Sequence, residues 1–245
     1  MNFLLRLLFK LCSFGFAVAS AAGLALSLYA LSLLPNLPTV EQIRAVPLNI
    51  PLRIYSADGK LVAEYGNERR IPVTLDQAPP LLLDAILVTE DDNFYYHTGV
   101  DFPGIARALL SNIRNQSRGQ GASTVTMQVV RNFFLNPEKT YERKLKEVLL
   151  AFNMERALTK DEILELYLNK IFLGHRAYGF AAAAQVYYGA TLENLSVPEI
   201  AMLAGLPKAP SRDNPISNPT RAETRRDYVL KRLFDLGKID RLTLE

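Results

Sequence analysis

The feature that most constrains this chain is a long apolar run near its N-terminus, over residues 11–34. No charged side chain interrupts this run. As a helix, at about 1.5 Å per residue, it is long enough to cross a hydrocarbon core of roughly 30 Å. We therefore predict one membrane-spanning anchor, followed by a folded body built from the residues after it.

The charges that flank the run predict its orientation. Arg6 and Lys10 precede it, and by the positive-inside rule they hold residues 1–10 in the cytoplasm. The chain after Pro35 then lies on the far side, in a bacterial periplasm or exterior. A cleaved signal peptide is the alternative, because several small alanines occur in the run. The large residues that continue to the end of the run favour an uncleaved anchor.

Composition argues against several classes of site. The 28 Lys and Arg residues against 25 Asp and Glu residues give a net charge of only +3, so bulk charge does not point to nucleic acid. The single cysteine, Cys12, lies in the apolar run, which excludes a disulfide framework and a cysteine metal site. With only two histidines, His97 and His175, a histidine-rich metal site is not expected either.

A linker and a hairpin are predicted over residues 35–78. Prolines at positions 35, 38, 47 and 51 predict an extended linker, because proline cannot continue a helix or a central strand. Residues 53–56 and 60–65 then flank an Asp58-Gly59 turn, which predicts a short β-hairpin. From Pro79 onward the pattern is mostly helical, and residues 79–237 form the main predicted domain.

An acidic stretch, Glu90–Asp101, carries five titratable side chains. It follows an apolar run, so Glu90 is expected where a buried helix gives way to a loop. Partial desolvation there would raise the pKa of its carboxyl and make it a usable base near neutral pH. Asp101, two residues before Pro103, is typical of a helix N-cap. An acidic loop with ordinary capping residues is the alternative for the whole stretch.

Two further segments carry polar residues at helical spacing. Residues 119–124 predict a mobile loop, in which Ser123 or Thr124 caps a helix that bears Gln128, Arg131 and Asn132. The backbone N–H groups at such a helix start, with a nearby arginine, form a ready phosphate site. Taken in isolation, the loop is better explained as an ordinary flexible loop and cap. A long helix is predicted over residues 138–158. On it Arg143, Lys144 and Glu147 can converge, as they also would in a solvated salt bridge.

Helix boundaries in the remaining chain are marked clearly. Thr159 and Ser196 each open a capping box, Gly189 is typical of a helix C-terminus, and Asn218-Pro219 starts a last long helix. Residues 238–245 are expected to begin a connection to a further C-terminal domain.

Taken together, five segments in order resemble the peptidoglycan glycosyltransferases of family 51. These are the membrane-anchored polymerase modules of class A penicillin-binding proteins and of monofunctional transglycosylases. The resemblance covers roughly residues 52–236. The segments that carry it are Glu90-Asp91 with Phe94, His97, Gly99 and Asp101; Gly121–Gln128 continuing to Arg131-Asn132; Arg143–Glu147; Lys160–Asn169; and Arg226 with Val229-Leu230.

This resemblance implies a fold class and marks two departures. The implied fold is mainly α, with a lysozyme-like glycosyltransferase lobe and a smaller membrane-side lobe, preceded by the transmembrane helix and the hairpin. The family usually carries two glutamines where this chain has Met127-Gln128, so any polar contact from the first is lost. The Ser-x-x-Lys, Ser-x-Asn and Lys-Thr-Gly motifs of a transpeptidase are absent, so that activity is not encoded in these 245 residues.

The activity that the resemblance implies is polymerisation of lipid II into β-1,4 glycan strands, with undecaprenyl pyrophosphate leaving and the anomeric centre inverted. Glu90 matches the general base, and Glu147 matches the second carboxylate, which orients the donor or assists the leaving group. Asp91 and His97 would support the loop. The cations that would stabilise the pyrophosphate are Arg131, Arg143, Lys144 and, as a further candidate, Lys139. The polar side chains that would line the donor cleft are Ser123, Thr124, Gln128 and Asn132.

The remaining expectations concern cofactors, partners and location. No cofactor is required and no protein metal site is predicted, although Mg²⁺ or Mn²⁺ could bridge pyrophosphate oxygens. The expected partners are lipid II, the growing glycan strand, the bacterial inner membrane and the proteins of cell-wall synthesis. Two rival functions stay open. One is a lysozyme-like or lytic glycan-cleaving enzyme, and the other is a non-catalytic periplasmic scaffold.

Overall fold

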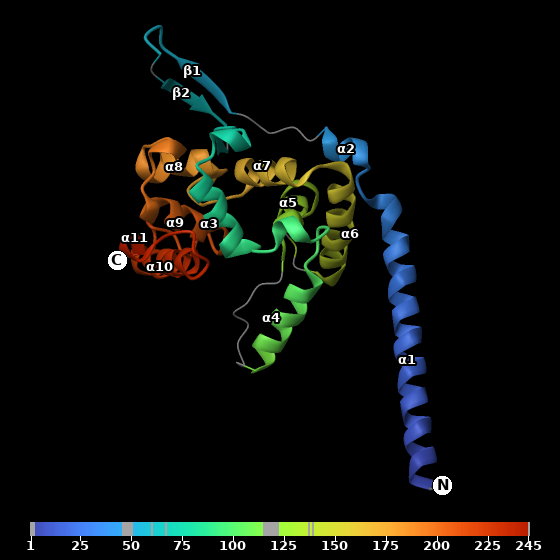
Figure 1. Cartoon of the computed structure of the whole chain (residues 1–245). Helices are drawn as coiled ribbons and strands as arrows, with labels where there is room; N and C mark the ends of the chain where they lie inside the picture. Colours follow the sequence, from blue (N-terminus) through green and yellow to red (C-terminus); the bar gives the residue numbers. More distant parts are fainter. Residues whose placement is uncertain are drawn as a thin grey trace.

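The computed structural model describes residues 3–45, 51–59, 61–66, 68–114, 123–136, 138 and 140–244. In this part of the chain the fold is mainly helical, as predicted (Figure 1). The α-helices are α1 (Phe3–Leu33), α2 (Val40–Arg44), α3 (Pro80–Glu90), α4 (Phe102–Arg114), α5 (Val125–Phe134), α6 (Tyr141–Ala157), α7 (Lys160–Lys170), α8 (Phe180–Tyr188), α9 (Val197–Gly205), α10 (Pro219–Asp235) and α11 (Arg241–Leu244). The strands are β1 (Leu52–Tyr55), β2 (Leu61–Tyr65), β3 (Arg69–Arg70) and β4 (Ala177–Tyr178), and 3₁₀ turns η1 to η5 span Leu34–Asn36, Leu75–Gln77, Phe94–Tyr96, Leu192–Asn194 and Leu206–Lys208.

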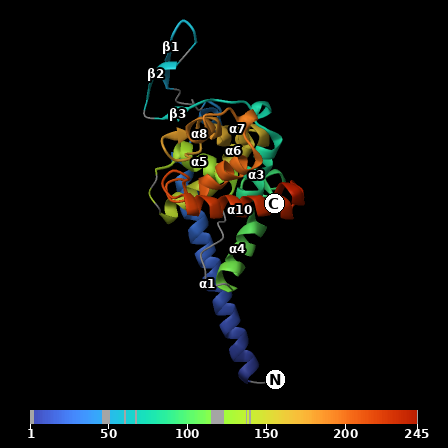
Figure 2. The same cartoon turned by 90° about the vertical axis from the view of Figure 1, so that its left-hand side faces the viewer.

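Helix α1 stands away from the body and ends beside α6 (Figures 1 and 2). The apolar span Phe9–Asn36, most of it in α1, contains an 18-residue window with a mean hydropathy of 1.9, of which 6% is buried, so it is suited to lipid contact. At the body end Leu33 is buried, and the Tyr29 hydroxyl donates a hydrogen bond to Glu142 Oε2 at 3.3 Å. Helix α1 therefore fits a membrane anchor, and its end contacts the body directly.

The predicted extended linker is partly wrong, because it contains the short helix α2. The Thr39 hydroxyl accepts a hydrogen bond from the Gln42 backbone N–H, and Gln42 Oε1 accepts one from the Thr39 backbone N–H, which completes a capping box. Ile43 is 1% exposed and joins the main core, where α2 packs against α6. The prolines only bracket this turn of helix. Pro47 lies outside the described residues.

The predicted hairpin is confirmed. Strands β1 and β2 pair antiparallel, with Leu52 opposite Tyr65, and Gly59 adopts a φ of 79° in the turn. A left-handed φ of this kind suits glycine, which has no Cβ to clash. The hairpin projects from the body on the side opposite to the free end of α1 (Figures 1 and 2).

Two helical layers enclose the main core. Helix α3 packs against α9 and α10, and α5 packs against α6 and α7. The alanine-rich start of α8 is buried among them. The capping boxes at Thr159 and Ser196 are present, and Gly189 ends α8 with a φ of 65°, as predicted. Helix α6 begins at Tyr141, later than predicted, because the Thr140 side chain caps it.

Helix α4 projects from the body in the same direction as α1 (Figures 1 and 2). Its predicted cap is confirmed, since Asp101 Oδ1 accepts a hydrogen bond from the Gly104 N–H at 2.9 Å. Phe102 and Leu110 are 60% and 68% exposed on this helix. Residues 115–122, which include most of the predicted mobile loop, lie outside the described residues.

Candidate active site

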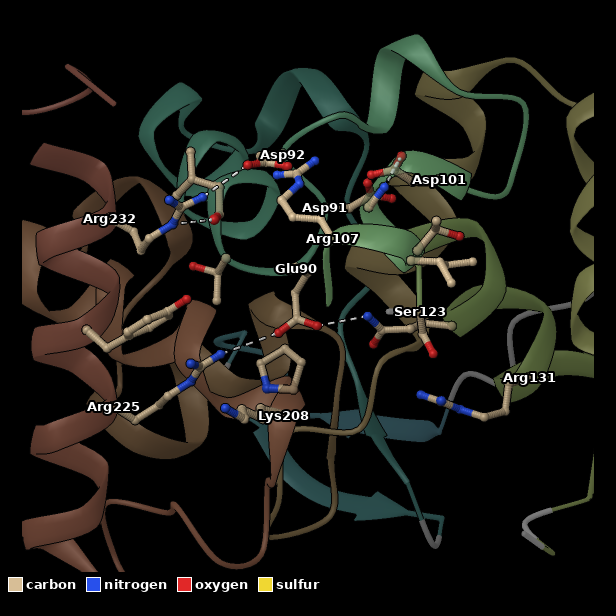
Figure 3. Close-up of a pocket in the computed structure, with 18 residues that line it drawn as sticks. Glu90, Asp91, Asp92, Asp101, Arg107, Ser123, Arg131, Lys208, Arg225 and Arg232 are labelled. Atoms are coloured by element: carbon tan, nitrogen blue, oxygen red, sulfur yellow. Dashed lines mark hydrogen bonds and ion pairs between the residues drawn. The ribbon is translucent and has the colours of Figure 1, made fainter. Parts of the chain in front are cut away.

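A cavity of about 400 Å³ lies where the C-terminal end of α3 meets the N-terminal ends of α4 and α5 and one face of α10 (Figure 3). Most of its lining is polar, and charged side chains come from five separate elements. Four carboxylates and five cations line it: Glu90, Asp91, Asp92 and Asp101; Arg107, Arg131, Lys208, Arg225 and Arg232.

Glu90 is the last residue of α3 and lies in the middle of this cavity (Figure 3). Its side chain is 12% exposed. Gln128 Nε2 donates a hydrogen bond to Glu90 Oε2 at 2.8 Å, and Arg225 Nη2 lies 3.7 Å from Glu90 Oε1. Burial raises the pKa of the Glu90 carboxyl, and this effect outweighs the opposing Gln128 bond and the nearby cations. A partly buried carboxyl with a raised pKa is suited to accept a proton near neutral pH.

The loop after Glu90 holds the start of α5 in place. Asp91 Oδ2 accepts a hydrogen bond from the Val125 backbone N–H at 2.9 Å, and both Asp91 oxygens contact His97 Nε2. The Gly99 N–H donates to His97 Nδ1 at 3.1 Å, so the ring donates to Asp91 through Nε2. Asp91 and His97 therefore support the loop through hydrogen bonds.

Thr124 fixes the first turn of α5. Its hydroxyl accepts a hydrogen bond from the Met127 N–H and donates one to the Gly99 carbonyl at 2.6 Å. Thr124, rather than Ser123, is therefore the cap of this helix. The positive end of the helix dipole lies beside the cavity, which Ser123, Thr124, Gln128 and Arg131 all line.

A second charged cluster lies on α6, next to the cavity. Glu147 is fully buried and forms ion pairs with Arg143 and, at 3.0 Å, with Lys144. Lys144 Nζ also lies 2.7 Å from Ser123 Oγ, so one hydrogen bond joins the cluster to the rim of the cavity. None of the three α6 residues lines the cavity itself. Arg143 Nε is buried without a hydrogen-bond partner among the described residues.

Two predicted site residues have other surroundings. Asn132 is exposed on α5 and does not line the cavity. Lys139 lies outside the described residues. The position where the family usually has a glutamine is interior: Met127 is 0% exposed and packs with Val100 and Ala151. Methionine therefore fills an apolar gap there.

Sequence reasoning missed the cations that close the cavity from the C-terminal half of the chain. Lys208 ends the turn η5, and Arg225 and Arg232 lie on α10. Arg232 pairs with Asp92 at 3.1 Å. Two signals were available. Arg225 adjoins Arg226, which carries part of the family resemblance, and Arg221, Arg225 and Arg232 recur at helical spacing, which does not distinguish a site from a solvated face.

The described residues contain no group of three or more His, Cys, Asp or Glu side chains that could hold a metal ion. All four cavity carboxylates have protein partners: Glu90, Asp91, Asp92 and Asp101.

Comparisons with known proteins agree on one family. A transglycosylase family model matches residues 58–234. The chain is 57% identical over 205 residues to penicillin-binding protein 1A of Escherichia coli K12, covering 84% of this chain and 24% of the relative. It is 53% identical over 210 residues to penicillin-binding protein 1A of Pseudomonas aeruginosa, covering 86% and 26%. A crystal structure of penicillin-binding protein 1A from Haemophilus influenzae matches with a TM-score of 0.47 and 36% identity, over 81% of this chain and 20% of that one. The chain spans about a quarter of the length of the curated relatives.

Proposed function

The chain belongs to the transglycosylase family, and we propose that it is a peptidoglycan glycosyltransferase that polymerises lipid II into β-1,4 glycan strands for the bacterial cell wall. The observation that carries the proposal is Glu90, a carboxyl with a raised pKa in a cavity that five cationic side chains also line. Glycosyl transfer from a lipid pyrophosphate needs this combination, because one group must take a proton while others stabilise a departing anion.

In the proposed reaction, the 4-hydroxyl of the acceptor lipid II attacks the anomeric carbon of the donor chain. Glu90 takes the hydroxyl proton as the new carbon–oxygen bond forms. The bond between the anomeric carbon and the pyrophosphate oxygen breaks, and undecaprenyl pyrophosphate leaves with the electron pair. The displacement occurs from the opposite face and inverts the centre. Glu90 then returns its proton to water, and no covalent intermediate is required.

Cations on the α5 and α6 side would stabilise the donor pyrophosphate. Arg131 lines the cavity from the last turn of α5, and Lys144, which pairs with the same Glu147 as Arg143, donates a hydrogen bond to Ser123. Glu147 would hold Arg143 and Lys144 in place. Ser123, Thr124 and Gln128 would line the donor cleft, and Asn132 stays a prediction without a contact to the cavity.

The anchor would serve this reaction by holding the active site at the surface where the lipid substrate is found. Helices α1 and α4 extend from the same side of the body, and α4 exposes Phe102 and Leu110 (Figure 2). We propose that residues 1–10 lie in the cytoplasm, residues 11–34 cross the inner membrane, and the glycosyltransferase domain, residues 79–237, lies in the periplasm with its α4 side toward the lipid. Residues 35–78 would join anchor and domain, and 238–245 would lead to a further domain in a longer protein.

Mg²⁺ or Mn²⁺ would act here only by bridging pyrophosphate oxygens. The partners would be lipid II, the glycan strand and other proteins of cell-wall synthesis.

The test is incubation of the purified chain with lipid II in detergent, followed by gel separation of products with and without a muramidase. Polymer that the muramidase degrades supports the proposal. Cleavage of preformed glycan without use of lipid II would favour the lytic enzyme, and inactivity toward both with an intact fold would favour the scaffold.

A further inference from the structure

The two carboxylate oxygens of Glu90 have unlike partners. Gln128 Nε2 is 2.8 Å from Oε2, which is an ordinary hydrogen bond. Arg225 Nη2 is 3.7 Å from Oε1, too far for a hydrogen bond although close enough for strong attraction between charges. The arginine contact is therefore the looser of the two, and another anion can replace it.

Arg225 is held by its inner end. Its Nε–H donates a hydrogen bond to the Gly205 carbonyl at 3.2 Å, and its guanidinium carbon lies 4.7 Å from the centre of the Tyr228 ring. A guanidinium has five N–H donors in a fixed plane, and the Gly205 bond uses one of them. The terminal nitrogens reach toward Glu90 across the cavity (Figure 3). Because the guanidinium is planar, its terminal nitrogens move with the whole group, through rotation of the aliphatic bonds of the side chain.

The charges that line the cavity do not balance around Glu90. Asp92 is paired with Arg232, Asp91 holds His97 and the α5 backbone, and Asp101 caps α4. Glu90 is then the one remaining cavity carboxylate, and four cations line the same space: Arg225, Lys208, Arg131 and Arg107.

The three cations other than Arg225 form no ion pair among the described residues. Burial, and then the repulsion from Arg225, lower the pKa of the Lys208 ammonium. The empty cavity therefore has surplus positive charge and favours a polyanion such as a pyrophosphate, which Arg225 can bind in a bidentate manner.

We propose that Arg225 is a positioning residue that pairs with Glu90 in the empty site and turns to the pyrophosphate of the acceptor lipid when that lipid binds. This inference rests on the proposed function, because it concerns the same base and the same substrate class. Binding would then remove a cation from Glu90 and bring an anion near it. Both changes raise the pKa of the carboxyl, so the base becomes stronger only when an acceptor is present.

Other charged groups face Glu90 and set the background for this change. These groups affect the pKa of Glu90 with or without a bound lipid. Lys208 on η5, Arg131 on α5 and the Tyr167 hydroxyl on α7 interact with it electrostatically. The others line the cavity: Asp91, Asp92, Asp101, Arg107 and Arg232. A variant that changes Arg225 alone therefore measures the contribution of Arg225 to the pKa of Glu90.

The first experiment measures the pH dependence of lipid II polymerisation. The acidic limb of the pH profile of kcat/KM reports the pKa of the base in the free enzyme. The acidic limb of the pH profile of kcat reports the pKa of the base in the enzyme–substrate complex. In wild type we expect the kcat limb at higher pH than the kcat/KM limb. In Arg225→Gln the kcat/KM limb should move to higher pH, so the gap in pH between the two limbs narrows. Lys231→Gln, which removes an exposed charge on the same helix, keeps the wild-type gap. An unchanged gap in Arg225→Gln would overturn the proposal.

A second variant shifts Arg225 without changing any charge. A Cβ at Gly205 would lie 2.9 Å from Arg225 Cγ, and Gly205 has an ordinary helical φ of −77°, so Gly205→Ala displaces the arginine side chain with no backbone strain. We expect a narrowed gap here as well. A wild-type gap in Gly205→Ala, with loss of the gap in Arg225→Gln, would assign the effect to charge alone and overturn the positioning role.

A titration that needs no turnover separates this inference from the proposed function. The Glu90 carboxyl is followed by carbon NMR in the full chain in detergent, with and without inorganic pyrophosphate. We expect pyrophosphate to raise the pKa of Glu90 in wild type, and Arg225→Gln to start from a higher value and rise less. If wild type polymerises lipid II while pyrophosphate raises this pKa equally in both proteins, the inference fails and the function stands. If the titration behaves as expected and lipid II is untouched, the function fails.

Discussion

Gln128 Nε2 donates a hydrogen bond of 2.8 Å to Glu90 Oε2, across 38 positions of sequence. This bond joins the last residue of α3 to the first turns of α5. The same helix start is held by Asp91, the neighbour of Glu90, through the Val125 N–H. The base and its hydrogen-bond donor are therefore positioned by one connected set of contacts.

Removal of the Gln128 amide should weaken catalysis in a pH-dependent way. Its bond favours the ionised form of Glu90, so Gln128→Leu should raise the pKa of the base further. The acidic limb of the polymerisation rate should move to higher pH, with a severalfold loss at pH 7 that recovers as the pH rises. Met127→Leu, in the same helix turn but facing the apolar core, is the matched control. A pH profile of Gln128→Leu that coincides with wild type would contradict this role.

Glu90 should also lower the stability of the protein at neutral pH. The folded pKa of Glu90 is raised, so the folded state binds this proton more tightly than the unfolded state. Stability therefore falls as the pH rises from the ordinary carboxyl pKa of 4.5 through the folded pKa. Glu90→Gln removes this loss of stability, because the glutamine side chain does not ionise. Its thermal midpoint should exceed that of wild type at pH 7, and the difference should shrink below about pH 4. Equal midpoints at pH 7 would show that the carboxyl is not effectively desolvated.

Gly99 should tolerate no side chain. It has a φ of 94°, and a Cβ there would lie 2.9 Å from the Ala151 carbonyl oxygen. Gly99→Ala should destabilise the protein by more than the roughly 1–2 kcal/mol of a left-handed alanine alone, and should lower activity because Gly99 holds His97 and Thr124. Gly237→Ala, with a φ of 68° and open space around it, isolates the backbone cost. Equal urea midpoints for the two variants would contradict the predicted clash.

Glu147 should matter for stability as well as for catalysis. Glu147→Gln leaves Arg143 and Lys144 without their buried carboxylate, and we expect a loss of roughly 2–4 kcal/mol, because removal of one partner leaves a charge uncompensated. Arg143 is 17% exposed and Lys144 45% exposed, so solvent reduces the cost. Glu142→Gln, on the exposed face of the same helix, should unfold close to wild type. A Glu147→Gln protein as stable as wild type would show that the cluster is solvated.

Much of the architecture could be predicted from local sequence signals. The anchor, the Asp58-Gly59 turn and the caps at Asp101, Thr159 and Ser196 each depend on residues within one or two turns of each other. The missed helix α2 also had a local signal, Thr39 with Gln42, but the prolines around it favoured an extended linker.

The candidate site could be predicted only in part, because one wall of its cavity comes from segments distant in the sequence. Glu90 and the start of α5 belong to recognisable motifs. Lys208 and Arg225 reach the cavity only because α9 and α10 pack against α3, and no spacing in the sequence encodes that approach. The burial that decides between a base and an ordinary acidic loop is likewise a property of the packed fold.

The central claim is that Glu90 is the base of a lipid II polymerase. The most direct test measures lipid II consumption and polymer length for wild type beside Glu90→Gln, with both proteins shown to be folded in detergent. We expect wild type to make polymer and Glu90→Gln to lose at least about a hundredfold in rate. Polymer formation by Glu90→Gln at a rate near that of wild type would contradict the assignment.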